Sequence, residues 1–219
     1  MFERVVLLLL LVLAQCGNAA EPTFRVATYN VESYLDQPSG HRKAKSVEAK
    51  AKVCENIASI KPDVIGLEEM GTTNALMELQ RSLKTAGVDL PFWEHVSGHD
   101  TNIHVAVLSR FPIVARRPHT NDAFLLGSHR HFVSRGFGEV EIEVTPKYRF
   151  TLVVAHLKSR LAVGNADEAE QRLQEAVVLR ELIDARLAAN PELNLIVLGD
   201  FNDVRDSAPL KTIIGGGAN

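Results

Sequence analysis

The chain has 219 residues, a formal net charge of −3, 46% hydrophobic residues and two cysteines. This composition is close to the globular average, which excludes a collagen-like, disordered or coiled-coil chain. The length fits a single domain of ordinary size, and two cysteines are too few to replace a hydrophobic core.

The N-terminus has the layout of a secretory signal. A charged start precedes an apolar run over residues 5–14, and small or polar residues follow it. This run is too short to span a bilayer, so we expect residues 1–19 to be cleaved and the protein to be exported, periplasmic or secreted. Lipoprotein anchoring through Cys16 is the alternative. The mature chain would carry no transmembrane segment, and its single domain would cover residues 22–219.

The sequence pattern of the first half of the chain predicts strands that alternate with helices. Apolar runs predict strands over residues 24–30, 63–67 and 105–108. Helical spacing of apolar residues predicts helices over residues 46–61 and 73–86. Pro62 ends the first helix and Gly87 ends the second.

The second half contains the clearest strand pattern. In residues 138–145 apolar residues alternate strictly with three glutamates, which predicts a strand with one buried and one solvated face. A hairpin should join it to residues 148–155. A helix is expected over residues 167–189, and its expected apolar line is Ala169, Leu173, Ala176, Leu179, Ile183 and Leu187. The apolar run at 194–198 predicts a strand covered on both faces. Together these elements predict a layered α/β domain with some antiparallel pairing.

Polar side chains follow four of the expected strands. They are Asn30 and Glu32, Glu68 and Glu69, His156, and Asp200, Asn202 and Asp203. Carboxylate and carboxamide oxygens suit magnesium or manganese, which typically retains water and takes only one or two protein carboxylates. Such a site favours phosphoester hydrolysis, because a cation can stabilise charge on the phosphate and the leaving oxygen.

Five short motifs in the same order resemble those of the endonuclease/exonuclease/phosphatase superfamily. They are residues 28–32 (TYNVE), 62–69 (PDVIGLEE), 105–110 (VAVLSR), 153–156 (VVAH) and 198–202 (LGDFN). Each string alone is weak, and five in order are specific. The resemblance implies a four-layer sandwich in which two mixed β-sheets are flanked by helices. It also implies metal-dependent hydrolysis of a phosphoester.

The resemblance assigns roles to six of these residues. It implies that Glu69 is a direct metal ligand and that Asn30 and Glu32 support the metal, which would be Mg²⁺ or Mn²⁺. His156 would contact the scissile phosphate, Asp200 would orient or deprotonate the attacking water, and Asn202 would hold the phosphate or the nucleophile.

Three further residues are candidates for substrate binding. Asn102 lies in the loop that enters the third motif, and Arg135 and Lys158 could pair with a substrate phosphate. For Arg42 and its basic neighbours we expect ordinary surface solvation, and we expect Glu68 to be a surface residue near a helix start.

The resemblance also implies a Ser-Asp-His motif on a late strand, and no histidine follows Asn202. We therefore expect the chain to stop before the last strands of the fold and, as given, to be nearly inactive.

The leading interpretation is an exported, monomeric, metal-dependent nuclease that cleaves nucleic-acid phosphodiesters. The alternatives are hydrolysis of a phospholipid or a small phosphoester, and a catalytically inactive binding protein. A net charge of −3 excludes only a broad basic surface for tight, nonspecific DNA binding.

Overall fold

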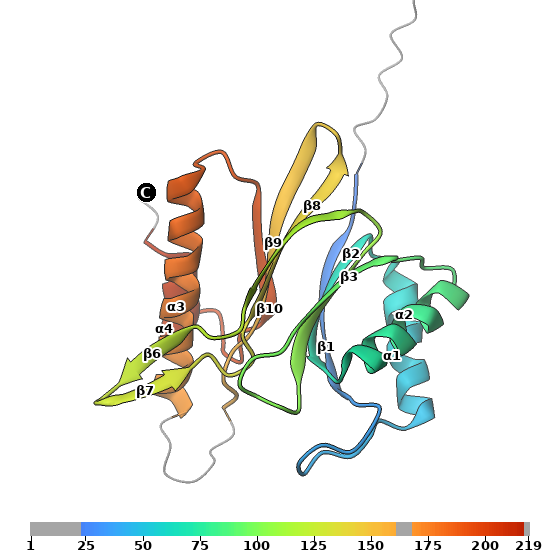
Figure 1. The fold of residues 1–219 in the computed structure, drawn as a ribbon, viewed down its shortest axis with the longest axis horizontal. Helices are drawn as coiled ribbons and strands as arrows, with labels where there is room; N and C mark the ends of the chain where they lie inside the picture. Colours follow the sequence, from blue (N-terminus) through green and yellow to red (C-terminus); the bar gives the residue numbers. More distant parts are fainter. Residues whose placement is uncertain (1–22, 161–167, 217–219) are drawn as a thin grey trace, which may run out of the picture.

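Two four-stranded sheets lie face to face between two pairs of helices (Figure 1). The computed structural model describes residues 23–160 and 168–216. The expected signal at residues 1–19, including Cys16, lies outside the described residues. The part of the chain that is described has no helix long and apolar enough to cross a membrane.

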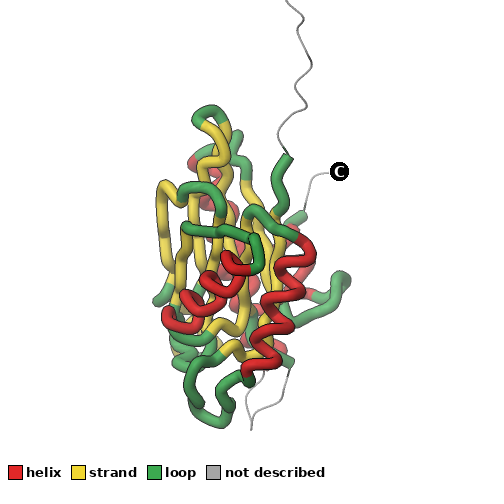
Figure 2. The backbone as a smooth tube through the Cα atoms, turned by 90° about the vertical axis from the view of Figure 1, so that its right-hand side faces the viewer, coloured by secondary structure: helices red, strands yellow, loops and turns green. Residues whose placement is uncertain are grey.

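The first sheet has the strand order β1-β2-β4-β3. Its strands are β1 (Val26–Tyr34), β2 (Val64–Met70), β3 (Phe92–Val96) and β4 (His104–Ser109). β1 and β2 are parallel, whereas β4 runs antiparallel to both of its neighbours. Helices α1 (Val47–Ile60) and α2 (Thr73–Thr85) cover the outer face of this sheet, and Figure 2 views the molecule from their side.

The second sheet has the order β10-β9-β8-β5. Its strands are β5 (Ile113–His119), β8 (Phe137–Thr145), β9 (Tyr148–His156) and β10 (Leu195–Asp200). β10 is parallel to β9, and the other pairs are antiparallel. Helices α3 (Glu168–Ala189) and α4 (Ala208–Ile214) cover its outer face. A separate two-stranded ribbon, β6 (Ala123–Leu126) with β7 (His129–Phe132), projects beside α3 (Figure 1).

The fold class expected from the sequence is confirmed: the protein is an α/β sandwich of two mixed sheets flanked by helices. Residues of both sheets, among them Val64, Val107, Leu152 and Val154, form the apolar layer between them. Local signals set the helix starts, since the side chains of Ser46 and Thr72 each accept a hydrogen bond from a backbone N–H three residues later.

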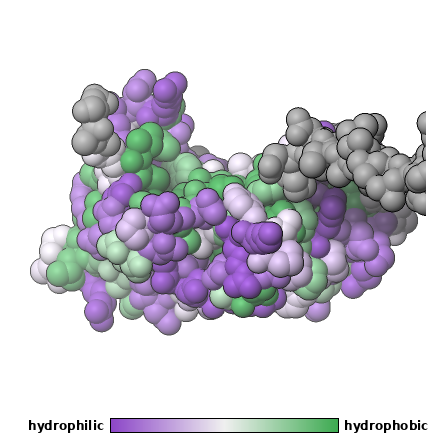
Figure 3. Space-filling view, turned by 90° about the horizontal axis from the view of Figure 1, so that it is seen from above, coloured by the Kyte–Doolittle hydropathy of each residue, from purple (hydrophilic) through white to green (hydrophobic). Residues whose placement is uncertain are grey.

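The two ends of the sheets differ in polarity. At one end Phe24 stacks on Phe150 with ring centroids 5.3 Å apart, and it also contacts Phe111 and Tyr148. Figure 3 looks onto the upper end of the molecule and shows a band of apolar surface between polar flanks. The carboxyl ends of β1, β2, β9 and β10 lie at the other end, where the polar residues gather.

Two expectations about the faces of these elements were wrong. The glutamate face of β8 is not fully solvated, because Glu139 is completely buried and pairs with Arg117, His119 and Arg186. The buried face of α3 is polar in its first half. The buried residues there are Glu168, Arg172 and Glu175, and not the expected Ala169 and Leu173.

β10 packs on both faces, as expected. It forms the edge of its sheet in the described chain, and all six of its residues are half-buried. Its apolar composition reflects the layer between the sheets and the contact with α3, since Leu198 packs in the first and Val197 in the second.

Candidate active site

Strand periodicity places the central polar residues between the two sheets. The layer between the sheets receives apolar side chains from β2, β9 and β10, and these are Val64, Val154 and Leu198, respectively. Each strand presents alternate residues to that layer, so the last inward positions are Glu68, His156 and Asp200. Asn30 pairs in register with Glu68, and Asp200 pairs with His156. The layer thus changes from apolar to polar as the strands end.

Asn30 joins the two sheets at this polar end. Its Nδ2 donates to Asp200 Oδ2 at 2.9 Å and to Glu69 Oε1 at 3.3 Å. Its Oδ1 accepts a hydrogen bond from the backbone N–H of Glu32 at 2.9 Å, which fixes the orientation of the amide. Residues expected from separate motifs therefore meet around a single side chain.

Glu69 has two further partners that the sequence did not predict. Its Oε2 accepts from Ser33 Oγ at 3.0 Å, and Arg42 forms an ion pair with the same oxygen at 3.3 Å. The expectation that Arg42 is simply solvated was wrong. No local sequence pattern predicts these contacts, because they depend on a turn in which Glu32 and Ser33 adopt left-handed backbone conformations.

Backbone strain is concentrated at this site. Four of the five non-glycine residues with positive φ in the described chain lie here, and they are Glu32, Ser33, Glu69 and Asn202. Each such conformation costs on the order of 1 kcal/mol or more, and it persists where the surrounding structure enforces it. Such clusters are typical of functional sites.

His156 is a buried imidazole with 2% exposure. Its Nε2 lies 4.0 Å from Asp200 Oδ2. Burial, with the nearby charge of Arg135 in the same direction, lowers the pKa of His156 to about 4. The ring is therefore neutral at pH 7 and can donate one hydrogen bond and accept another.

Asn202 fixes the carboxylate of Asp200. Its backbone N–H donates to Asp200 Oδ1 at 2.9 Å, and its Nδ2 donates to the carbonyl oxygen of Leu157 at 2.9 Å. Asp200 is thus held by Asn202 through one oxygen and by Asn30 through the other. A carboxylate held through both oxygens in this way has a defined orientation.

Glu68 is a residue of the site that the sequence analysis placed on the surface, and this placement was wrong. It is 1% exposed, and Thr28 Oγ1 donates to its Oε1 at 2.7 Å. Burial raises the pKa of Glu68 to about 8, and the neighbouring charges of Asp200 and Glu69 act in the same direction. The period of two along β2 was the signal that could have found it, because Val64, Gly66 and Glu68 share one face.

A cavity of about 500 Å³ opens at these side chains. It is lined by Glu32, Ser33, Arg42, Glu69, Arg135, His156, Ser159, Arg160 and Asn202. Arg135 is 6% exposed, donates from a terminal guanidinium nitrogen to the carbonyl of Leu157 at 3.2 Å, and pairs with Asp100 at 3.3 Å. Of the three residues expected to bind substrate, only Arg135 lines this cavity.

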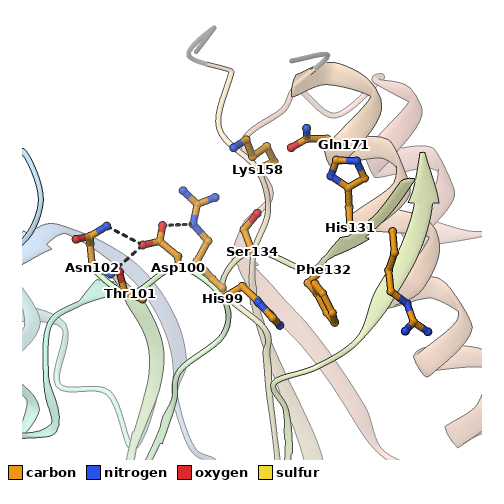
Figure 4. Close-up of a pocket in the computed structure, with 11 residues that line it drawn as sticks. His99, Asp100, Thr101, Asn102, His131, Phe132, Ser134, Lys158 and Gln171 are labelled. Atoms are coloured by element: carbon orange, nitrogen blue, oxygen red, sulfur yellow. Dashed lines mark hydrogen bonds and ion pairs between the residues drawn. The ribbon is translucent and has the colours of Figure 1, made fainter. Parts of the chain in front are cut away.

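Asn102 and Lys158 line a neighbouring cavity instead, which Arg135 also borders (Figure 4). Asn102 Oδ1 accepts a hydrogen bond from Ser39 Oγ at 2.7 Å, and its backbone N–H donates to Asp100 Oδ1 at 2.9 Å. The two cavities are adjacent, because Arg135 lines both of them.

The donor set around Asn30 fits a hard divalent cation. Two carboxylates, those of Glu69 and Asp200, come together and are held by the NH₂ group of Asn30. Mg²⁺ typically takes one or two carboxylates and completes its shell with water and substrate oxygens. No group of three or more His, Cys, Asp or Glu residues that could hold a metal by themselves occurs in residues 23–160 and 168–216. A cation held here would thus depend on water or substrate for most of its ligands.

An α/β sandwich with carboxylate, amide and imidazole groups at the junction of its sheets defines a class of phosphoesterases, and comparison with known proteins agrees. Residues 27–217 match the Endonuclease/Exonuclease/phosphatase family. The chain belongs to this family. No curated protein sequence matches the chain significantly.

Three solved structures illustrate the likeness of this fold to known proteins. A beta toxin variant from Staphylococcus aureus with bound magnesium ions has a TM-score of 0.62 at 16% identity, over 87% of this chain and 69% of that one. The human Nocturnin catalytic domain with bound sulfate has a TM-score of 0.63 at 18% identity, over 88% and 70%. Sphingomyelinase C from Streptomyces griseocarneus has a TM-score of 0.60 at 19% identity, over 89% and 69%. At such identities the likeness establishes the fold alone.

Proposed function

We propose that the protein is an exported, monomeric, divalent-metal-dependent phosphodiesterase that cleaves nucleic acid. The observation that carries the proposal is the hydrogen bonding of Asn30 to both Glu69 and Asp200, with His156 4.0 Å from Asp200. Glu69, supported by Asn30 and Glu32, would hold Mg²⁺ or Mn²⁺, which would stabilise negative charge on the phosphate and the leaving oxygen.

The chain's own residues would position water and phosphate. Asp200, fixed by Asn30 and Asn202, accepts a hydrogen bond from the attacking water and takes its proton as the water oxygen bonds to phosphorus. The ester bond to the leaving oxygen breaks in the same displacement. His156 is neutral at pH 7 and donates a hydrogen bond to a phosphate oxygen, and Arg135 adds positive charge on the same side of the cavity.

The test compares the chain with a version extended through a Ser-Asp-His motif, each assayed on the small diester bis(4-nitrophenyl) phosphate with Mg²⁺ or Mn²⁺ and with excess chelator. We expect turnover only with metal and chiefly from the extended version, in which Asp200→Asn or His156→Ala should reduce kcat by about 10²- to 10⁴-fold while circular dichroism shows a retained fold. Asp206→Asn, at an exposed aspartate on the following loop, is the matched control.

Turnover that survives chelation, or that both substitutions leave intact, would contradict the metal-site proposal. No turnover of any diester would favour a binding protein. A panel of single- and double-stranded DNA, RNA, sphingomyelin and inositol phosphates separates nucleic acid from a phospholipid or a small phosphoester. Mass spectrometry of the protein recovered from an expressing bacterial host would test export, since cleavage after residue 19 leaves a defined N-terminus.

A further inference from the structure

The neighbouring cavity has a volume of about 500 Å³ and lies outside the catalytic groups. Its walls come from four parts of the chain: the loop before β4, β7 with the residues after it, the segment after β9, and α3 (Figure 4). Arg135 borders this cavity and the catalytic one, so a substrate extending from the scissile phosphate past Arg135 enters it.

The cavity carries positive charge that the protein itself does not neutralise. Lys158 and Arg130 form no ion pair with any residue within the two described segments. The one carboxylate in the wall, Asp100, is already engaged by Arg135 and Asn102 (Figure 4). An anionic group is therefore the favoured occupant beside Lys158 and Arg130.

The same cavity offers an aromatic platform. The rings of His99 and Phe132 stack with centroids 3.9 Å apart and planes inclined by 17°. Phe132 remains 36% exposed although it is apolar. Figure 4 shows these two rings on one side of the cavity, with Lys158 and Gln171 on the other. Stacking against an aromatic platform is how proteins bind the bases of single-stranded nucleic acids.

We propose that this cavity is a nucleotide subsite, in which the His99–Phe132 platform stacks a base and Arg130 and Lys158 bind the phosphate linked to it. The proposal rests on the proposed function and defines its substrate as a single strand with a base next to the cleaved linkage. A phospholipid fits the cavity less well, because its headgroup carries no flat ring and the remaining wall residues, such as Thr101, Ser134 and Gln171, are polar.

Binding without turnover tests the subsite directly. The probe is a fluorescein-labelled single-stranded DNA tetranucleotide, measured by anisotropy in excess chelator with the full chain. Phe132→Ala should weaken binding about tenfold, as expected for the loss of one stacked base. Phe92→Ala is the matched control, since Phe92 is also 36% exposed but lies at the start of β3, at the opposite end of its sheet.

A second probe separates stacking from charge. With a tetranucleotide whose four residues are all abasic, the effect of Phe132→Ala should vanish. Arg130→Ala should still weaken binding severalfold and reduce its salt dependence. Arg81→Ala, at an exposed arginine on α2, controls for the loss of one surface charge.

The outcomes distinguish this subsite from the function on which it rests. If Phe132→Ala and Phe92→Ala bind the tetranucleotide equally well, the subsite proposal is overturned. The proposed function still stands in that case if bis(4-nitrophenyl) phosphate is hydrolysed with Mg²⁺. If the protein binds sphingomyelin vesicles in a way that requires Phe132 and does not bind the tetranucleotide, the nucleotide subsite is overturned in favour of a lipid site. Base-dependent binding without hydrolysis of any diester, by the chain or by the version extended through a Ser-Asp-His motif, overturns the proposed function and leaves a nucleotide-binding cavity.

Discussion

Glu68 is a carboxyl group buried beside the candidate active site, and its burial has a measurable consequence for stability. Its pKa of about 8 in the folded protein lies above the ordinary value of 4.5. The folded state therefore retains a proton that the unfolded chain releases. Stability from this group is fully present below about pH 4.5 and is lost as the pH rises toward 8.

We predict that Glu68→Gln removes this pH dependence. Glutamine keeps an oxygen that can accept the hydrogen bond of Thr28, but it does not titrate. Urea unfolding in chelator at pH 5, 6.5 and 8 should show the wild type losing roughly 3–4 kcal/mol more than the variant across this range. The exposed Glu192→Gln should behave as the wild type, and parallel curves for wild type and Glu68→Gln would contradict the prediction.

Individual residues show where sequence reasoning about the site succeeds and where it fails. Asn30, Glu69, His156 and Asp200 were expected at one candidate site because each lies at the end of an apolar strand, and the structure brings these four side chains together. Glu68, Ser33 and Arg42 were missed or placed on the surface. Their contacts follow from strained turns and from the meeting of two sheets, which no local pattern encodes.

At the scale of elements, α3 supports the segments on both sides of the site with a polar buried face. Glu175 is 1% exposed and accepts three hydrogen bonds. Ser134 donates to Oε1 from its backbone N at 2.8 Å and its hydroxyl at 2.7 Å, and the backbone N of Lys158 donates to Oε2 at 2.6 Å. One carboxylate thereby fixes the segment before Arg135 and the segment after His156.

We predict that Glu175→Gln lowers kcat as well as stability. An amide replaces one carboxylate oxygen with an NH₂ group, so a buried donor loses its acceptor at a cost of about 1–3 kcal/mol. The shift in the two segments should reduce kcat for the small diester about tenfold. Kinetics are measured at a temperature where the variant remains fully folded by circular dichroism.

Two variants on the same helix give the controls. Leu179→Ala, at a fully buried apolar position, should destabilise the protein by about 2–5 kcal/mol and leave kcat nearly unchanged. Glu181→Gln, on the exposed face, should change neither quantity. If Leu179→Ala lowers kcat as much as Glu175→Gln does, Glu175 has only a structural role.

The sequence predicted the helices and strands that have a regular apolar pattern and missed those that lack one. Helices α1 and α2 and the β8–β9 hairpin were expected close to where they lie, because their spacing and end signals are local. β3, β5 and the β6–β7 ribbon were missed. The ribbon includes the sequence His-Arg-His-Phe at residues 129–132, which has no alternating apolar face, and backbone pairing alone defines it as strand.

At the scale of the whole molecule, the site requires the two sheets to approach closely, because Asn30 and Glu69 belong to one sheet and His156 and Asp200 to the other. Gly66 permits this approach. A Cβ atom there would lie 2.5 Å from Leu198 Cδ1 and 2.9 Å from Val154 Cγ2 of the opposite sheet. The resemblance to a known family predicted two packed sheets, but the distance between them depends on side chains that are remote in sequence.

We therefore predict that Gly66→Ala separates the sheets and impairs both stability and activity. Overpacking should cost about 1–3 kcal/mol in urea unfolding, and kcat for the small diester should fall about tenfold as Asn30 moves from Asp200. Gly138→Ala is the matched control in β8 of the opposite sheet, where the nearest atom, Val96 Cγ2, is 3.6 Å from the added carbon. That substitution should have little effect on either measurement.

Leu198→Ala should partly rescue Gly66→Ala, because it removes the side chain that the new methyl group meets. Alone it leaves a void and destabilises the protein, yet in the double variant the void accepts the added carbon. The double-mutant cycle should therefore show a favourable coupling of about 0.5–3 kcal/mol, with partial recovery of kcat. Strict additivity in stability and in kcat would mean that the spacing of the sheets at Gly66 does not control the geometry of the site.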